Sequence, residues 1–198
     1  MKLNIIHLPT KYFQPYTKEF DESAKRQISF QKEMQEQGIE YQVWDAILDE
    51  VNPFVGCSQS HKMIVRDAKE RGAKMVAIAE DDITFFAPGA YDYFINNTPG
   101  IFDLYLGTTY SAVQYPDGKI KDFFDSLILY MVHERFYDKF LSMPEVSHLD
   151  RELSRITNDN VYRICQPIVC AQVDGYSFNA RYVRNIKHRL NEQLKFGS

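Results

Sequence analysis

The stretch VAIAEDDITFF, at residues 76–86, sets three consecutive carboxylates between two apolar runs. Short apolar runs with polar or turn residues around them are typical of strands buried in a sheet. Carboxylates held close together at a strand end repel one another unless a cation or protons relieve them. Glu80, Asp81 and Asp82 therefore predict either a divalent-cation site at the end of a strand or a solvated turn in which an aspartate caps backbone amides.

The geometry of a strand makes these carboxylates unequal. Side chains alternate along a strand, so Glu80 and Asp82 point one way and Asp81 the other if the chain stays extended. We therefore do not expect three equivalent ligands. Hard divalent ions such as Mg²⁺ and Mn²⁺ suit carboxylate oxygens and would relieve the repulsion.

The segments around this stretch alternate between strand and helix patterns. The predicted strands are 3–8, 40–44 and 74–79, and the predicted helices are 21–38 and 57–72. In the first helix, Asp21 or Ser23 is the expected N-cap, and Ile28, Phe30 and Met34 are expected to face inward. This alternation predicts an α/β fold with a mostly parallel central sheet flanked by helices. Ligands in such sheets bind beyond the carboxyl ends of the strands, where the three carboxylates lie.

The second half of the chain is less regular. Strand-like runs occupy 103–111, 125–132 and 161–178, and short helices are expected at 133–143 and 148–156. We expect an antiparallel or mixed extension of the same sheet, within a single domain that covers residues 1–198. A terminal amphipathic helix is expected at about 180–195. Its apolar stripe either packs on the domain or rests on an anionic membrane, with its basic residues at the lipid headgroups.

Composition excludes some classes of function. The net charge of -4 argues against nucleic acid as a partner, because proteins that bind it usually carry a basic excess. The first residues, MKLNIIHLPT, resemble neither a signal peptide nor a membrane span, so we expect a cytoplasmic protein. The three cysteines match no zinc-binding spacing and are expected to be reduced thiols.

The helix predicted at 57–72 brings a histidine toward the sheet. Cys57, His61, Ile64, Val65 and Ala68 form its apolar stripe. His61 is then either a core histidine bonded to a loop carbonyl or a ligand near a helix N-terminus that favours phosphate. Ser58 and Ser60 are candidates for the N-cap of this helix.

Residues 55–86, VGCSQSHKMIVRDAKERGAKMVAIAEDDITFF, resemble glycosyltransferase family 25. This family includes bacterial lipooligosaccharide galactosyltransferases and the galactosyltransferase domain that acts on collagen hydroxylysine. The resemblance joins Gly-Cys-x-x-Ser-His at 56–61 to Glu-Asp-Asp at 80–82. Weaker similarities are YQVWDAI at 41–47, DLYLG at 103–107, HLDREL at 148–153 and QPIVCAQVDGYSF at 166–178.

The resemblance implies a GT-A fold, a nucleotide-sugar donor and Mn²⁺ or Mg²⁺ as cofactor. By position, Asp82 and Glu80 correspond to the metal and diphosphate site, and Asp81 lies nearer the ribose or donor sugar. His61, Ser60 and Arg26 correspond to donor-binding positions. Asp150 corresponds to the catalytic base, although a plain N-cap aspartate is the alternative. Gln172 and Ser177 correspond to residues at the acceptor.

The sequence thus predicts a metal-dependent, inverting hexosyltransferase in cell-surface glycan synthesis, such as that of lipopolysaccharide. Its partners would be a uridine-diphosphate sugar, with galactose as one candidate, and a saccharide or glycolipid acceptor. Two alternatives stay open: a non-catalytic binding module of the same fold, and a metal-dependent nucleotidyl- or phosphotransferase. The segment 123–132 lacks the Gly-Thr features of the family, and this departure leaves the acceptor open.

Overall fold

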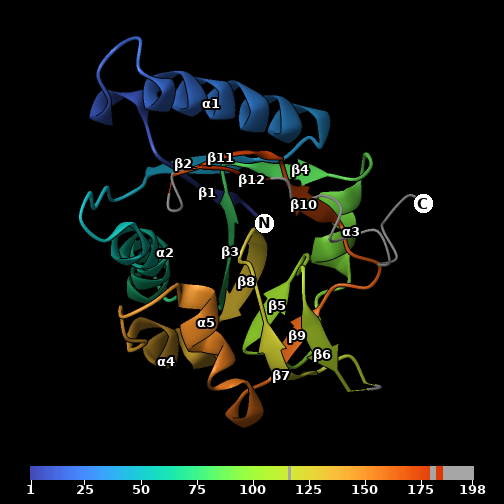
Figure 1. The fold of residues 1–198 in the computed structure, drawn as a ribbon. Helices are drawn as coiled ribbons and strands as arrows, with labels where there is room; N and C mark the ends of the chain where they lie inside the picture. Colours follow the sequence, from blue (N-terminus) through green and yellow to red (C-terminus); the bar gives the residue numbers. More distant parts are fainter. Residues whose placement is uncertain (116, 179–181, 185–198) are drawn as a thin grey trace.

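The computed structural model describes residues 1–115, 117–178 and 182–184. The amphipathic helix expected at about 180–195 lies mostly outside the described residues. Its described part, Tyr182–Arg184, is the strand β12, so the expectation of a helix is wrong there. A six-stranded sheet with the strand order β2-β1-β3-β8-β5-β9 forms the centre (Figure 1). The bounds are β1 Leu3–His7, β2 Tyr41–Asp45, β3 Met75–Glu80, β5 Leu104–Leu106, β8 Leu129–His133 and β9 Tyr162–Ile164.

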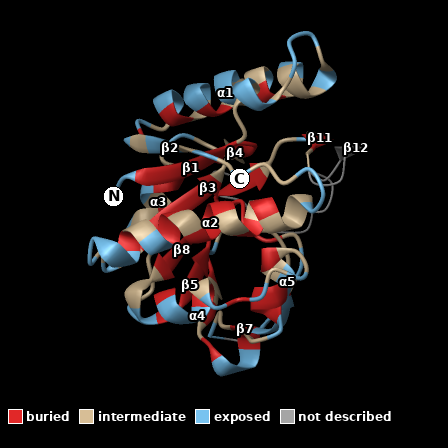
Figure 2. Ribbon diagram, turned by 90° about the vertical axis from the view of Figure 1, so that its left-hand side faces the viewer, coloured by how far each residue is buried: buried red, intermediate tan, exposed pale blue. Residues whose placement is uncertain are grey.

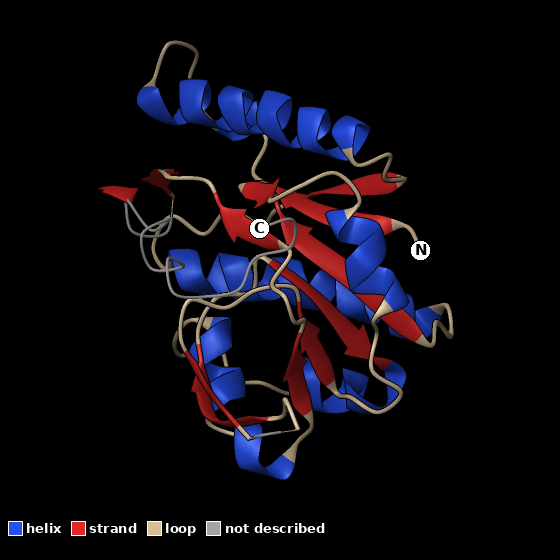
Figure 3. Ribbon diagram, turned by 90° about the vertical axis from the view of Figure 1, so that its right-hand side faces the viewer, coloured by secondary structure: helices blue, strands red, loops and turns tan. Residues whose placement is uncertain are grey.

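Only β8 runs against its neighbours in this sheet, and the other strand pairs are parallel. The predicted α/β class with a mostly parallel central sheet is therefore confirmed, as is the mixed extension in the second half. Helices lie on both sides of the sheet (Figure 3). They are α1 Lys18–Glu36, α2 Pro53–Glu70, α3 Ala90–Asn96, α4 Tyr137–Leu141 and α5 Leu149–Ser154.

The two faces of the sheet belong to two separate apolar cores. Strand β8 shows the division, because Tyr130 and Val132 pack into the core under α2, α4 and α5, whereas Leu129 and Met131 pack into the core under α1 and α3. This alternation is the period of two that a strand imposes on its side chains. Figure 2 shows the buried strands between helices whose outer sides are exposed.

Short ribbons and turns complete the described chain. The paired strands are β4 Ile83–Phe85 with β10 Cys170–Gln172, β6 Ala112–Gln114 with β7 Ile120–Phe124, and β11 Gly175–Ser177 with β12 Tyr182–Arg184. The 3₁₀ turns are Thr10–Tyr12, Glu134–Phe136 and Thr157–Asp159. Among the described helices, none has the length and apolar character needed to cross a bilayer.

Helix α1 begins earlier than the sequence predicts. The hydroxyl of Thr17 accepts a hydrogen bond from the Phe20 amide at 3.3 Å, so Thr17 is the N-cap and not Asp21 or Ser23. The expectation that Ile28 faces inward is also wrong, because this side chain is 69% exposed. Phe30 is fully buried, and two residues along a helix turn about 200° around its axis, which sends Ile28 to the solvent side.

Helix α2 also begins before its predicted start. Asn52 precedes the helix and Pro53 occupies its first turn, where the missing proline N–H costs nothing. Ser58 and Ser60 therefore lie inside the helix and are not its N-cap. The inward stripe is confirmed, since His61, Ile64, Val65 and Ala68 are buried.

Gly56 allows the loop after β2 to lie against α2. A Cβ at this position would stand 2.4 Å from the carbonyl oxygen of Ile47 and 2.9 Å from the amide nitrogen of Asp49. Both atoms belong to backbone, which cannot give way as a flexible side chain does. The glycine thus fixes where residues 47–49 run.

We predict that Gly56→Ala lowers the free energy of unfolding by about 1–3 kcal/mol, the usual range for overpacking. The loss should appear although alanine is the better helix former. Urea denaturation measures it, with Gly100→Ala as the control because a Cβ there meets no atom within 4 Å. Equal stability of the two variants would contradict the close approach of the loop.

Candidate functional site

A cleft of about 1050 Å³ lies beyond the carboxyl ends of β1, β2 and β3. This is the edge of the sheet at which the sequence places a ligand. Every side chain that the resemblance assigns to metal, donor, base or acceptor lines this cleft. These residues are Arg26, Ser60, His61, Glu80, Asp81, Asp82, Asp150, Gln172 and Ser177.

Asp81 is held by two partners inside the protein. Its Oδ2 lies 2.7 Å from Nδ1 of His7, and its Oδ1 accepts a hydrogen bond from Nη1 of Arg26 at 2.7 Å. Burial would raise the pKa of Asp81, but the positive charge of Arg26 and the contact with His7 outweigh it and lower the pKa. Asp81 is therefore a charged group whose oxygens are already engaged.

Asp82 is equally buried but less completely satisfied. Its Oδ2 accepts a hydrogen bond from the Gln172 side chain at 2.5 Å and lies 3.1 Å from Nη1 of Arg26. Its Oδ1 is buried and has no hydrogen-bond partner among the described residues. Burial raises the pKa of Asp82 to about 7, against the opposing charge of Arg26, and the charges of Glu80 and Asp81 add to the rise. Asp82 thus retains one oxygen for a ligand.

Arg26 connects three parts of the chain at this point. Besides both aspartates, its guanidinium donates a hydrogen bond to the carbonyl oxygen of Tyr176 at 2.6 Å and lies 5.1 Å from the centre of the Phe178 ring. The sequence assigns Arg26 to the nucleotide and Gln172 to the acceptor. In the structure, both side chains are bonded to the acidic stretch. Ser177 is buried beside Tyr176 in β11.

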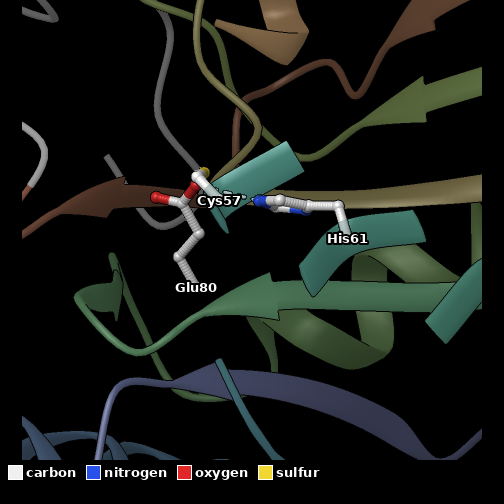
Figure 4. A group of neighbouring side chains, drawn as sticks. All are labelled: Cys57, His61 and Glu80. Atoms are coloured by element: carbon white, nitrogen blue, oxygen red, sulfur yellow. Dashed lines mark ion pairs between the residues drawn. The ribbon is translucent and has the colours of Figure 1, made fainter. Parts of the chain in front are cut away.

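Glu80 belongs to a second cluster, with Cys57 and His61 of α2 (Figure 4). Nδ1 of His61 lies 2.6 Å from the hydroxyl of Tyr130, and its Nε2 lies 3.4 Å from Oε1 of Glu80. Burial lowers the pKa of His61, but hydrogen bonds with Cys57 and Glu80 outweigh it and raise the pKa to about 10. One ligand atom from each of the three residues lies within 4.8 Å of the other two, so the group could hold a metal ion.

Sequence reasoning placed Cys57 on the inward stripe of the helix but did not assign it as a metal ligand. The cysteines are free thiols, as expected. The absence of a zinc-binding spacing argues only against a site built from several cysteines. It does not exclude a site that combines one cysteine with ligands of other residue types. The signal that was available is the spacing of Cys57 and His61, which lie one turn apart on the same helical stripe.

The hydroxyl of Ser60 is engaged within the protein. It donates a hydrogen bond to the carbonyl oxygen of Gly56 at 2.7 Å and accepts one from the Ile47 amide at 2.8 Å. Ser60 therefore ties the loop after β2 to α2, at the same place where Gly56 allows the close approach.

Two more carboxylates face the cleft from the second half of the chain. Asp150 lies in the first turn of α5, but it caps a different segment: its Oδ2 accepts a hydrogen bond from the Ser126 amide at 2.9 Å. Asp125, which the sequence did not single out, accepts bonds from the Tyr110 and Ser111 amides through Oδ1. Burial raises the pKa of Asp125, and the charge of Asp150 adds to the rise.

Comparison with known proteins is informative about the fold only. No protein-family model matches the chain, and no curated protein matches it either. Among solved structures, A197 from STIV has a TM-score of 0.52 at 11% identity, covering 92% of this chain and 93% of that one. At this identity, the likeness concerns the fold alone.

Two further structures are similar at lower scores. A glycosyltransferase involved in the glycosylation of the major capsid of PBCV-1 has a TM-score of 0.49 at 12% identity and covers 84% of this chain and 83% of that one. HddC from Yersinia pseudotuberculosis has a TM-score of 0.41 at 8% identity and covers 83% and 90%.

We predict that Arg26→Met lowers the free energy of unfolding by about 3–5 kcal/mol, because it leaves two buried carboxylates without their cation. Urea denaturation measures the loss. Lys25→Met is the control, since Lys25 pairs with Glu22 at an exposed position where an ion pair contributes little. Adding Asp81→Asn to Arg26→Met should recover part of the loss, and no recovery would contradict this explanation.

Proposed function

We propose that this chain is a metal-dependent glycosyltransferase that moves a hexose from a uridine-diphosphate sugar to a saccharide or glycolipid acceptor. The observation that carries the proposal is the position of Glu80 and Asp82, at the end of a parallel strand on the wall of a large cleft. Pockets for small molecules usually measure about 300–1,000 Å³, so the cleft has room for a nucleotide sugar. The sequence resemblance to glycosyltransferase family 25 also supports the proposal, with galactose transfer in lipopolysaccharide or lipooligosaccharide synthesis as the specific reaction.

The residues present fit a hard divalent ion. Asp82 offers a buried oxygen that has no hydrogen-bond partner among the described residues, and the Glu80 side chain is 27% exposed at the edge of the cleft. Mg²⁺ and Mn²⁺ are commonly bound by one or two carboxylates together with substrate phosphates. When bound, such an ion stabilises the negative charge that develops on the departing nucleoside diphosphate.

The remaining residues either hold Asp82 in place or stand ready to accept a proton. Arg26 and Gln172 hold Asp82 so that Oδ2 is occupied and Oδ1 is left for a ligand. Asp150 is our candidate for the group that takes the proton from the acceptor hydroxyl in an inverting transfer. Asp125 is the competing carboxylate, because it lies in the same cleft and its raised pKa favours accepting a proton.

The first test is donor binding. A uridine-diphosphate sugar with Mn²⁺ at a hundred times its Kd should stabilise the chain by about 2.7 kcal/mol, a rise in Tm of roughly 5–10 °C. Asp82→Asn should abolish the rise, whereas Asp92→Asn, at an exposed position, should preserve it. Differential scanning fluorimetry with and without chelator measures both.

Other outcomes of that test separate the alternatives. A shift with a nucleoside triphosphate and release of pyrophosphate would favour the nucleotidyltransferase. Donor binding with neither transfer to an acceptor nor hydrolysis of the donor would favour the binding module. The absence of any shift with donor or metal would overturn the proposal.

The second test identifies which carboxylate acts as the general base. Asp150→Asn should lower the rate of sugar transfer about 10²–10⁴-fold, the usual contribution of a general base, and should leave the donor-induced rise in Tm intact. Asp125→Asn serves as the matched variant in the same assay. A large loss in Asp125→Asn with little change in Asp150→Asn would move the role of base to Asp125.

A further inference from the structure

We propose that Cys57, His61 and Glu80 form a binding site for a zinc-class divalent ion. Such an ion differs in chemistry from the Mn²⁺ or Mg²⁺ of the proposed transfer reaction. The site follows from how these three side chains converge, and it would exist whether or not the chain transfers a sugar (Figure 4).

The separations suit tetrahedral coordination. Ligand nitrogen and oxygen atoms lie about 2.0–2.2 Å from zinc, so two of them at a tetrahedral angle are about 3.4 Å apart. Nε2 of His61 and Oε1 of Glu80 are 3.4 Å apart. The third ligand atom, from Cys57, lies within 4.8 Å of both, so a modest side-chain adjustment completes the set.

The elements that carry the ligands are rigid. Cys57 and His61 lie one turn apart on α2, and Glu80 is the last residue of β3, the strand against which α2 packs. Tyr130, which is fully buried in β8, contacts Nδ1 of His61. Metal-binding histidines usually have such a partner on the second nitrogen, because it fixes the ring and leaves the other nitrogen for the metal.

The donor types favour zinc over a hard ion. A thiolate and an imidazole suit zinc and related transition metals, whereas Mg²⁺ and Mn²⁺ favour oxygen ligands. The same three residue types could also form a nucleophile relay, but that arrangement needs the thiol and the carboxylate on opposite nitrogens of the imidazole. Here the hydroxyl of Tyr130 contacts Nδ1 and Glu80 faces Nε2, so the second nitrogen is not open for such a relay. The convergence of the three ligand atoms therefore favours a shared cation over a proton relay.

Access is provided by the cleft, which all three residues line. Three protein ligands leave one tetrahedral position open, as in catalytic zinc sites. Glu80 is shared with the Mn²⁺ or Mg²⁺ set, but its second oxygen points away from His61 in Figure 4. The proposed zinc site therefore engages one oxygen of this carboxylate.

Titration of the full chain with Co²⁺ and Zn²⁺, without any nucleotide, tests the site. We expect one Co²⁺ per chain, with a thiolate-to-metal absorption band that zinc displaces. Cys57→Ser should abolish the band, and the loss of zinc affinity should exceed 100-fold, more than the roughly 10–100-fold that follows loss of an outer partner. Tyr130→Phe tests that outer role and should fall within the lower range.

Cys165→Ala is the matched control, since it removes another free thiol that lies outside the cluster. The thiolate-to-metal absorption band should persist in Cys165→Ala. Thermal melting of each variant shows whether that variant is folded. Glu80→Gln removes a second ligand and tests the site without a change in the core, because this side chain lies at the edge of the cleft. No thiolate band in the native chain, or equal zinc affinity in the native chain and Cys57→Ser, would overturn the proposal and would leave the transferase proposal untouched.

Discussion

The arrangement of the cleft depends on one guanidinium placed between two buried carboxylates. Arg26 comes from α1, Asp81 and Asp82 follow β3, and Tyr176 belongs to β11, so the contacts of one side chain join segments 55 and 150 residues apart. A buried ion costs several kcal/mol unless a partner and further hydrogen bonds compensate it. Without Arg26, Asp82 would lose its cation, and Asp81 would keep only its contact with His7.

The same contact leaves a charge imbalance. One guanidinium faces Asp81 and Asp82, and Glu80 adds a third carboxylate at the edge of the cleft. Asp81 takes the closest contact with Arg26 and that of His7, so its pKa is lowered, whereas the pKa of Asp82 is raised. The fold therefore satisfies one aspartate and leaves its neighbour in need of a proton or a cation. This imbalance is the physical basis for expecting a cation at the site.

Local sequence patterns predicted the strands and the edge of the sheet at which the acidic stretch lies, because apolar runs and their polar ends are local signals. These patterns did not predict which charged side chains form ion pairs with one another. Asp125 and the pairing of Arg26 with Asp81 depend on contacts between distant segments, which no single stretch encodes. The predicted start of α2 was too late because Ser58 and Ser60 are good capping residues, whereas the helix begins at Pro53, which favours a first turn.

Glu80 belongs to two candidate metal-binding sets in this chain, one of hard oxygen ligands and one that includes a soft thiolate. Toward α2 it faces a thiol and an imidazole, and along the chain it is followed by carboxylates. Divalent-metal affinity follows ligand type, so an ion held with Cys57 and His61 and an ion held with Asp82 belong to different classes. A zinc-class ion at the first set would neutralise Glu80 and weaken its repulsion of Asp82, which would lower the pKa of that aspartate. Occupancy of one set would thus change the charge that the other offers, through a single carboxylate common to both.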